Sequence, residues 1–368
     1  MMRRHISYLL AVLFAGTLIA GDNGDDANDV AVFRGNLERT GVYPAGGPAE
    51  SAELVWKFKT GEAIFSSPVI AEDTVYFGSN DKHFYAVDIE SGRERWKFET
   101  GDIIRSSPAV SGGLVYFGSQ DGDFYALDVN TGQERWRVET ESWITSSPAV
   151  SDGVVYFGSD DTHLYAVDSA TGEEKWRFRT ISAVSAAPAI VDGTLYFNCD
   201  SQLYAVDIAT GEEKWQFRSL VPIHSSVAVS EGLVYSGGMF GFFRAVDIVT
   251  AEEKWHITQN PHSIWSSPAV SENTVYFGSQ DKHLYALDAT TGEQKWRFQT
   301  EGGIFPSPAV SGGVIYFGSN DGHLYAVDKM TGQEKWKFKT DDLIISSPAV
   351  SGGAVYFGSN DGYLYKLK

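Results

Sequence analysis

Four histidines recur at one position of a repeated pattern, and imidazole is a common ligand for zinc. They are His83, His163, His283 and His323. A zinc ion needs its ligands at about 2 Å, whereas these histidines belong to separate copies of the repeat. We therefore expect each one to begin a strand of its own copy, and we expect no metal site.

Serine pairs and carboxylates recur as well. The pattern Ser66-Ser67-Pro68 has copies along the chain, but no histidine and aspartate accompany it at a fixed spacing, as a nucleophilic triad requires. Asn320-Asp321-Gly322 and its copies hold too few carboxylates for a calcium loop and are typical of a tight hairpin. The single cysteine, Cys199, excludes an internal disulfide. These patterns predict turns and strand starts.

All of these motifs belong to one repeat, whose clearest phrase spans residues 166–176. A fixed period near 40 residues indicates a repeat architecture. Within one unit, short apolar segments alternate with turn residues and show no helical period, which predicts four short antiparallel strands. The phrase, or its tail in the first case, ends at tryptophans spaced 39 to 41 residues apart: Trp56, Trp96, Trp136, Trp176, Trp215, Trp255, Trp296 and Trp336.

Four short strands in forty residues are typical of a β-propeller blade. Sets of three strands begin near residues 68, 108, 148, 188, 227, 268, 308 and 348. The last set ends at Lys368 without a fourth strand, while residues 54–60 form a fourth strand without a preceding set. The sequence therefore predicts an all-β, eight-bladed propeller over residues 54–368. Its N-terminal strand joins the C-terminal blade and closes the ring.

The first residues have the features of an export signal. Arg3 and Arg4 precede an apolar run over residues 6–20, which is short for a membrane span. We predict a signal peptide over residues 1–21, without the cysteine that a lipid anchor needs, and an acidic spacer and lead-in over residues 22–53. An uncleaved signal anchor is the alternative. The mature chain is expected to be a monomer without a membrane span, periplasmic or at the cell surface.

The repeated phrase resembles the tryptophan-docking motif of quinoprotein-type (PQQ-like) propeller repeats. The matching positions are Ala166, Asp168, Thr171, Gly172 and Trp176. The resemblance implies that each tryptophan stacks on the glycine turn of a neighbouring blade, where no Cβ intervenes. Asp168 should brace that turn. The docking glycines are then Gly92, Gly132, Gly172, Gly211, Gly292 and Gly332.

This resemblance implies two classes of function. Quinoprotein dehydrogenases hold PQQ and Ca²⁺ with a catalytic Asp, ligating Glu and Asn and usually adjacent cysteines, and this chain has one cysteine and no long inserted loops. The chain is also similar to BamB-type outer-membrane assembly factors. We expect a non-catalytic scaffold without a cofactor that binds another envelope protein. A PQQ-dependent oxidoreductase and a carbohydrate- or ligand-binding propeller are the alternatives. The net charge of −19 disfavours nucleic acid and anionic membranes as partners.

Positions at which the copies differ are the candidates for a binding surface, with loop drift as the alternative explanation. The residue before each serine pair varies, and strand alternation should turn it towards the channel mouth. Blade 5 departs most, with Met and Phe in its second hairpin, and the linker after it, residues 259–265, is one residue longer. We predict a protein-binding face, or second a ligand pocket, from His224, Met239, Phe240, Phe242 and Trp265, with Phe65, Arg105 and Phe305 nearby.

Overall fold

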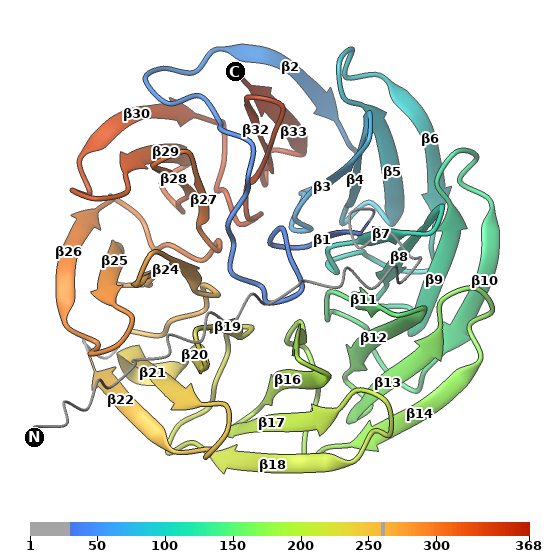
Figure 1. The fold of residues 1–368 in the computed structure, drawn as a ribbon. Coiled ribbons are helices and arrows are strands. Elements are labelled where there is room, and N and C mark those ends of the chain that lie inside the picture. Colours follow the sequence, from blue (N-terminus) through green and yellow to red (C-terminus); the bar gives the residue numbers. More distant parts are fainter. Residues whose placement is uncertain (1–29, 259–261) are drawn as a thin grey trace, which may run out of the picture.

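Eight four-stranded antiparallel blades surround a central channel in the computed structural model, which describes residues 30–258 and 262–368 (Figure 1). The predicted signal peptide, residues 22–29 and linker residues 259–261 lie outside the described residues. Among the described residues, no helix has the length and apolar character needed to cross a membrane. The predicted fold class is confirmed.

Seven blades use four consecutive strands each, counted from the channel outwards. The bounds in blades 1 to 4 are β3 (Val69–Ala71), β4 (Thr74–Gly78), β5 (His83–Asp88), β6 (Glu94–Glu99); β7 (Ala109–Ser111), β8 (Leu114–Gly118), β9 (Asp123–Asp128), β10 (Glu134–Glu139); β11 (Ala149–Ser151), β12 (Val154–Ser159), β13 (His163–Asp168), β14 (Glu174–Arg179); β15 (Ala189–Val191), β16 (Thr194–Cys199), β17 (Gln202–Asp207) and β18 (Glu213–Arg218).

Blades 5 to 7 follow the same plan, and blade 5 is the one blade with a short 3-10 helix in its second hairpin among the described residues. Their elements are β19 (Ala228–Ser230), β20 (Leu233–Gly237), η1 (Met239–Gly241), β21 (Phe242–Asp247), β22 (Glu253–Thr258); β23 (Ala269–Ser271), β24 (Thr274–Gly278), β25 (His283–Asp288), β26 (Gln294–Gln299); β27 (Ala309–Ser311), β28 (Val314–Gly318), β29 (His323–Asp328) and β30 (Glu334–Lys339).

Blade 8 is built from both ends of the propeller. Its inner strands are β31 (Ala349–Ser351), β32 (Ala354–Gly358) and β33 (Tyr363–Leu367), and its outer strand is β2 (Leu54–Lys59). Strand β2 pairs antiparallel with β33, and the backbones of Glu53 and Lys368 exchange two hydrogen bonds. The predicted closure is therefore confirmed.

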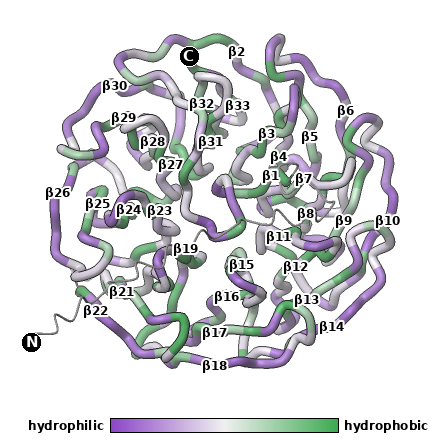
Figure 2. The backbone as a smooth tube through the Cα atoms, viewed as in Figure 1, coloured by the Kyte–Doolittle hydropathy of each residue, from purple (hydrophilic) through white to green (hydrophobic). Residues whose placement is uncertain are grey.

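Hydrophobic cores lie between neighbouring blades. The second strand of a blade is buried on both faces, as in β28, whereas the fourth strand alternates buried and exposed residues, as in β30. Because side chains of a strand alternate between its two faces, only the apolar ones of the fourth strand reach the core. Figure 2 shows the result, with hydrophilic outer strands around a more hydrophobic interior.

Tryptophans join each blade to the next in the predicted way. The Trp176 indole donates to the Ile208 carbonyl at 3.2 Å, and a Cβ on Gly211 would come within 2.6 Å of its ring. The Asp168 carboxylate accepts hydrogen bonds from the amides of Ala170 and Thr171 and from the Thr171 hydroxyl. The same indole-to-carbonyl bond occurs at all eight repeat tryptophans.

One docking contact has an unexpected partner. Blade 8 has no turn between its third and fourth strands, because these come from opposite ends of the chain. The Trp336 indole donates instead to the Pro48 carbonyl of the lead-in at 2.8 Å. In blade 5 the docking glycine is replaced by Ala251, which nevertheless adopts a positive φ of 56°.

The lead-in fills part of the channel. Strand β1 (Ala31–Val32) pairs with β7, and carbonyls of residues 37, 38, 40 and 41 accept backbone hydrogen bonds from the innermost strands of blades 4 to 7. Arg34 and Arg39 are almost completely buried and donate to carbonyls of other blades, including Ser267 at 2.7 Å and Pro188 at 3.0 Å. Burial lowers the pKa of both guanidinium groups to about 9, so they stay charged at neutral pH.

The serine pairs link the blades around the channel. The Ser67 amide donates to the Ser107 hydroxyl at 2.9 Å, and equivalent bonds join most neighbouring blades. The series closes on itself, since the Ser347 amide donates to the Ser67 hydroxyl. Its gap is at Ala187, which has no hydroxyl to offer Ser147. The serines are structural, as the sequence predicted.

Candidate functional site

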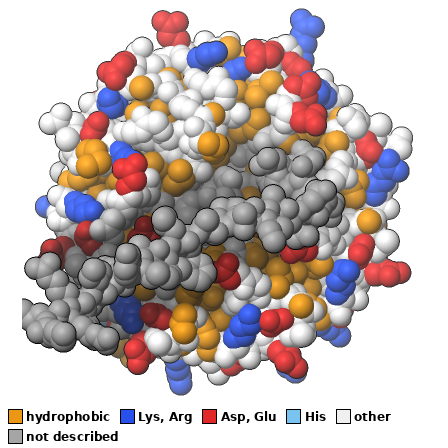
Figure 3. Space-filling model, in the orientation of Figure 1, with side chains coloured by type: hydrophobic (Ala, Val, Ile, Leu, Met, Phe, Trp, Pro, Cys, Tyr) orange, Lys and Arg blue, Asp and Glu red, His pale blue; other side chains and the backbone are white. Residues whose placement is uncertain are grey.

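The propeller has two faces with different loops. One carries the first and third turns of each blade together with the lead-in. The other, here called the linker face, carries the second hairpins and the blade-to-blade linkers. Figure 3 views the molecule from one side and shows, among the described residues, charged side chains mainly at the rim and hydrophobic ones inside the rim. The predicted site residues all come from the linker face.

The variable positions before the serine pairs form a ring on this face. The residue preceding each is a buried Ile or Val, as predicted. The Arg105 guanidinium lies over the Phe65 ring at 4.8 Å. The rings of His224 and Trp265 stack in parallel, with centroids 4.1 Å apart, and Phe305 lies 6.4 Å beyond Trp265. Burial lowers the pKa of His224, so the stacked imidazole is neutral at neutral pH.

The blade 5 hairpin lies between the linkers that carry His224 and Trp265. The Met239 amide donates to the Pro222 carbonyl at 3.0 Å, and the Ile264 amide donates to the Gly238 carbonyl at 2.9 Å. Phe240 is 53% exposed and has a positive φ of 56°, a conformation that is unfavourable for a bulky residue. The structure therefore brings Met239 and Phe240 beside the ring.

The expectation that Phe242 is exposed is wrong. Its side chain is buried and stacks on His256, with ring centroids 4.8 Å apart. The reason is Arg244, which replaces the tyrosine of other blades and is buried. The Arg244 guanidinium lies over the Phe242 ring at 4.4 Å and donates to the Ser219 hydroxyl at 2.5 Å. Phe242 thus covers a buried cation and is unavailable to a partner.

Three exposed apolar residues on this face were missed. Trp143, Ile181 and Leu220 are 53%, 61% and 91% exposed and lie on three consecutive linkers. These three residues stand earlier in their linkers than the variable residue that precedes each serine pair. Together with Phe240 and Trp265 they form what we call the apolar arc, which extends over blades 3 to 6.

In most blades an aspartate of the second hairpin binds the linker that enters the blade, and two blades lack this aspartate. In blade 1, the Asp81 carboxylate accepts a hydrogen bond from the Gly61 amide at 2.7 Å and so fixes the linker that enters the blade. Equivalent bonds occur in blades 2, 3, 7 and 8. Blades 4 and 5 carry Ser201 and Phe240 at this position. The linkers entering them are those with Ile181 and Leu220.

Two carboxylates accompany the apolar arc. Asp160 and Asp200 occupy hairpin positions at which most other blades carry Asn or Gln. Asp160 accepts a hydrogen bond from the Ser185 hydroxyl at 2.9 Å, and burial raises the pKa of its carboxyl. Within residues 30–258 and 262–368, neither carboxylate makes a salt bridge with a cation. This sector therefore offers negative charge beside exposed apolar groups.

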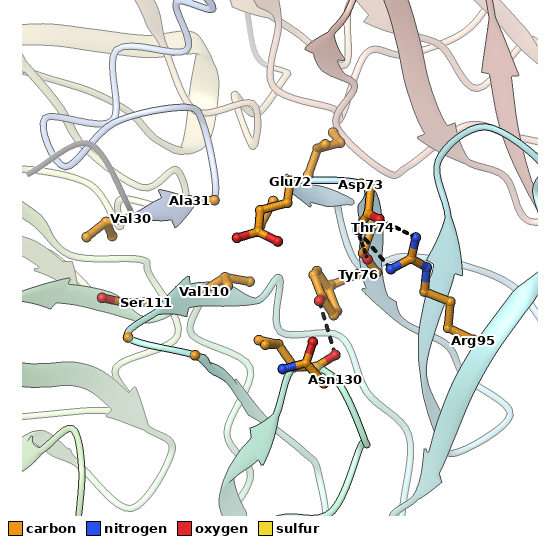
Figure 4. A pocket seen from close by; sticks show the side chains of 15 residues that line it. Val30, Ala31, Glu72, Asp73, Thr74, Tyr76, Arg95, Val110, Ser111 and Asn130 are labelled. Atoms are coloured by element: carbon orange, nitrogen blue, oxygen red, sulfur yellow. Dashed lines mark hydrogen bonds and ion pairs between the residues drawn. The ribbon is translucent and has the colours of Figure 1, made fainter. Parts of the chain in front are cut away.

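The opposite face has a cleft of about 250 Å³ between blades 1 and 2 (Figure 4). Its walls include Glu72, Asp73, Tyr76, Arg95 and Asn130. The Arg95 guanidinium is held by two carboxylates, those of Asp73 at 2.7 Å and Asp88 at 2.6 Å. The charged groups on this wall are thus largely engaged with one another.

The recurring histidines stand at strand starts, as expected, and the His83 ring lies 3.0 Å from the Asp81 carbonyl. The described part of the chain contains no group of three His, Cys, Asp or Glu side chains placed to hold a metal. Cys199 is buried and its thiol donates to the Ser182 carbonyl at 3.1 Å. The eight variable positions at the channel mouth include no carboxylate, the ligand that Ca²⁺ prefers, and the carboxylate placed beside them is that of Asp160, which accepts a hydrogen bond from Ser185.

Comparisons with known proteins agree with this architecture, and the chain is a PQQ-like β-propeller. It belongs to the family described as "Beta-alanine-activating enzyme, beta-propeller", whose model matches residues 72–314. The model of outer membrane protein assembly factor BamB matches residues 301–368. No curated protein matches the sequence.

Solved structures share the fold. BamB from Moraxella catarrhalis has a TM-score of 0.74 at 21% identity, covering 86% of this chain and 98% of that one. The computationally designed Ika8 protein has a TM-score of 0.77 at 21% identity, and the match covers 86% of this chain and 99% of that one. Quinohemoprotein alcohol dehydrogenase from Comamonas testosteroni has a TM-score of 0.80 at 15% identity, and the match covers 91% of this chain and 80% of that one. At these identities the similarity establishes the fold alone.

Two tryptophans with different surroundings test the division of the tryptophans into docking residues and surface residues. Trp176→Ala should cost about 3–5 kcal/mol of unfolding free energy, because it removes an indole docked on Gly211. Trp265→Ala should cost under about 1 kcal/mol, since Trp265 is 44% exposed. Denaturant midpoints measure both, and the reverse order would contradict the division into docking and surface tryptophans.

Proposed function

We propose that this protein is a non-catalytic, exported scaffold that binds another protein of the cell envelope through the apolar arc. The observation that carries the proposal is the grouping of five exposed large apolar side chains on neighbouring loops of one face. Single exposed apolar residues are ordinary, but a group of them is typical of an interaction surface. Aromatic residues such as Trp143 and Trp265 are frequent anchors of protein interfaces.

The repeat itself supports this use of the arc. At the position of Ile181 and Leu220, blades 1, 2, 3, 7 and 8 carry Gly, Glu or Asp. Folding of a blade therefore does not need an apolar residue there. An apolar side chain that is 91% exposed, as Leu220 is, lowers solubility unless something covers it.

The charges specify the partner further. A partner segment that suits this sector has apolar side chains for the arc and a basic side chain for Asp160 or Asp200. A cation beside Asp160 would stabilise its ionised form, which burial disfavours. The net charge of −19 would also steer a basic segment towards the protein.

The proposed location rests on one sequence prediction and one similarity. The predicted signal peptide supports export, and the similarity to BamB, an outer membrane protein assembly factor by its description, supports an envelope partner. The periplasm or the cell surface is the compartment that suits both.

The test is recovery of the partner from envelope extract with a double variant of the arc. Phe240→Ser with Trp265→Ser should abolish recovery of the protein that the wild-type chain binds, because each central aromatic anchor contributes about 2 kcal/mol or more. The melting temperature should barely change, since both side chains are largely exposed.

The chain offers a matched control on the opposite face. Val249→Ser with Met330→Ser removes two apolar side chains that are 83% and 72% exposed, and recovery should remain at the wild-type level. Unchanged recovery with the folded Phe240/Trp265 variant would instead exclude the arc. In that case the ring at Phe65 and Arg105 would be the next candidate.

A further inference from the structure

The outer strand of blade 8 differs from the other seven outer strands in one respect. Strand β2 begins with Leu54 and Val55, which are 44% and 48% exposed. The other outer strands begin with Glu or Gln followed by Lys or Arg, as in Glu174-Lys175 of β14. Figure 1 shows β2 at the rim of the propeller, as the outermost strand beside the C-terminus.

Charged residues on an outer strand protect it from pairing with other chains. In six blades the cation of this pair also binds the aspartate of the preceding turn, as Lys175 binds Asp168 at 3.1 Å, and in blade 7 Lys335 binds Glu50 of the lead-in. Blade 8 has no turn at this place and so no such carboxylate. Without that carboxylate, a cation at position 55 would have no partner in the blade. The missing carboxylate does not explain why two adjacent residues of β2 are apolar and exposed.

Charged residues of opposite sign flank the apolar pair in the sequence. Glu53 directly precedes the pair, Lys57 follows it after the half-buried Trp56, and both charged residues are exposed. Within the described part of the chain neither forms an ion pair, and the Lys57 ammonium lies over the Tyr363 ring at 4.1 Å. The strand therefore reads acidic, apolar and basic in order along its exposed edge.

This order is complementary to itself. When two copies of β2 approach antiparallel about a two-fold axis at Val55, Glu53 of each copy lies beside Lys57 of the other. The apolar residues meet at the centre, so the same patch serves both copies, as a two-fold interface requires. We propose that β2 is a contact through which two copies of this chain associate edge to edge.

Side chains, more than a continuous sheet, would make this contact. The pairing of β2 with β33 is irregular between Leu54 and Trp56, which leaves Val55 as an extra residue. Such a bulge interrupts the backbone ladder and turns side chains outward. One strand edge also buries less than the usual interface of about 1,600 Å², so the dimer should be weak, with a dissociation constant on the order of 10 µM.

The experiment is sedimentation velocity of the full-length chain at about 0.15 M salt, which screens the repulsion between two copies of net charge −19, at concentrations up to about 100 µM, tenfold above that constant. The wild-type chain should shift from monomer to dimer as concentration rises. Leu54→Glu with Val55→Lys recreates the start of the other outer strands, so it should remain a folded monomer. Its unchanged melting temperature would show that folding is intact.

Charge exchange tests the two-fold arrangement. Lys57→Glu should weaken the dimer about tenfold or more, because it places like charges together. Adding Glu53→Lys exchanges both charges in both copies and should restore association. A wild-type chain that stays monomeric throughout this range, or a Leu54/Val55 variant that associates as the wild type does, would overturn the proposal.

Discussion

Deleting residues 1–60 should unfold this protein under conditions in which a chain lacking only residues 1–29 is stable. The deletion removes β2, so Leu364 and Leu367 of β33, both fully buried, become exposed along an open edge. It also removes the lead-in with Arg34 and Arg39. Burial of a leucine contributes about 1.5–3 kcal/mol, so the loss should be about 5 kcal/mol or more, a large share of an ordinary stability.

A third variant separates the contributions of strand and lead-in. Deletion of residues 1–50 keeps β2 but loses the channel contacts of residues 30–43 and the Pro48 carbonyl that accepts from Trp336. Its melting temperature should fall between those of the other two deletions. Equal melting temperatures for the 1–50 and 1–60 deletions would contradict the closure of blade 8 by β2.

The second large effect should appear in alkaline solution. Burial is the first cause of a raised pKa at 16 of the 18 tyrosines, and it raises the pKa of Tyr116 from 10.0 to about 12. A hydrogen bond to the Asp81 carboxylate adds to the rise at Tyr85. The full set is Tyr43, Tyr76, Tyr85, Tyr116, Tyr125, Tyr156, Tyr165, Tyr196, Tyr204, Tyr235, Tyr276, Tyr285, Tyr316, Tyr325, Tyr356 and Tyr365.

The sign follows from proton linkage. Above pH 10 these phenols lose protons more readily in the unfolded chain than in the folded one. The loss of protons stabilises the unfolded state relative to the folded state and lowers the free energy of unfolding. Their stabilisation is complete below pH 10 and is lost as the pH rises towards 12 and beyond. Unfolding free energy measured against pH should therefore fall steeply in this range, with tyrosinate absorbance rising as the chain unfolds.

A single variant checks the cause of the alkaline effect. Tyr116→Phe removes one buried phenol and should make the decline with pH less steep. Its cost at neutral pH is the hydrogen bond to the Ser169 carbonyl, about 1 kcal/mol. A stability that stays constant between pH 10 and pH 12 would contradict the burial of these phenols.

The repeat made the fold predictable, because register, turns and docking residues were visible in several copies at once. Strand counting alone revealed that residues 54–60 belong with the last blade. The burial of Arg34 and Arg39 was not predictable. Arginine side chains are ordinarily exposed, and the carbonyls that bind these arginines converge only after the ring has closed.

The candidate site was predictable in part, for a similar reason. The neighbours of Trp265 followed from strand order, since equivalent positions of adjacent blades must lie side by side. The burial of Phe242 depends on Arg244 two residues later, a substitution inside the blade that a comparison of loops does not reveal. The exposure of Leu220 does have a signal in the sequence, because blades 1, 2, 3, 7 and 8 carry Gly, Glu or Asp at the same linker position.

The partnership of β2 with β33 also has a consequence for the order of folding. Their pairing joins residues more than 300 positions apart in sequence, as between Lys59 and Tyr363. Folding slows as contacts become more distant in sequence, and this pair cannot meet until almost the whole chain has been synthesised. Until then β2 remains an unpaired strand with an apolar start at Leu54 and Val55. The interval before ring closure is therefore the time at which the chain is most exposed to aggregation.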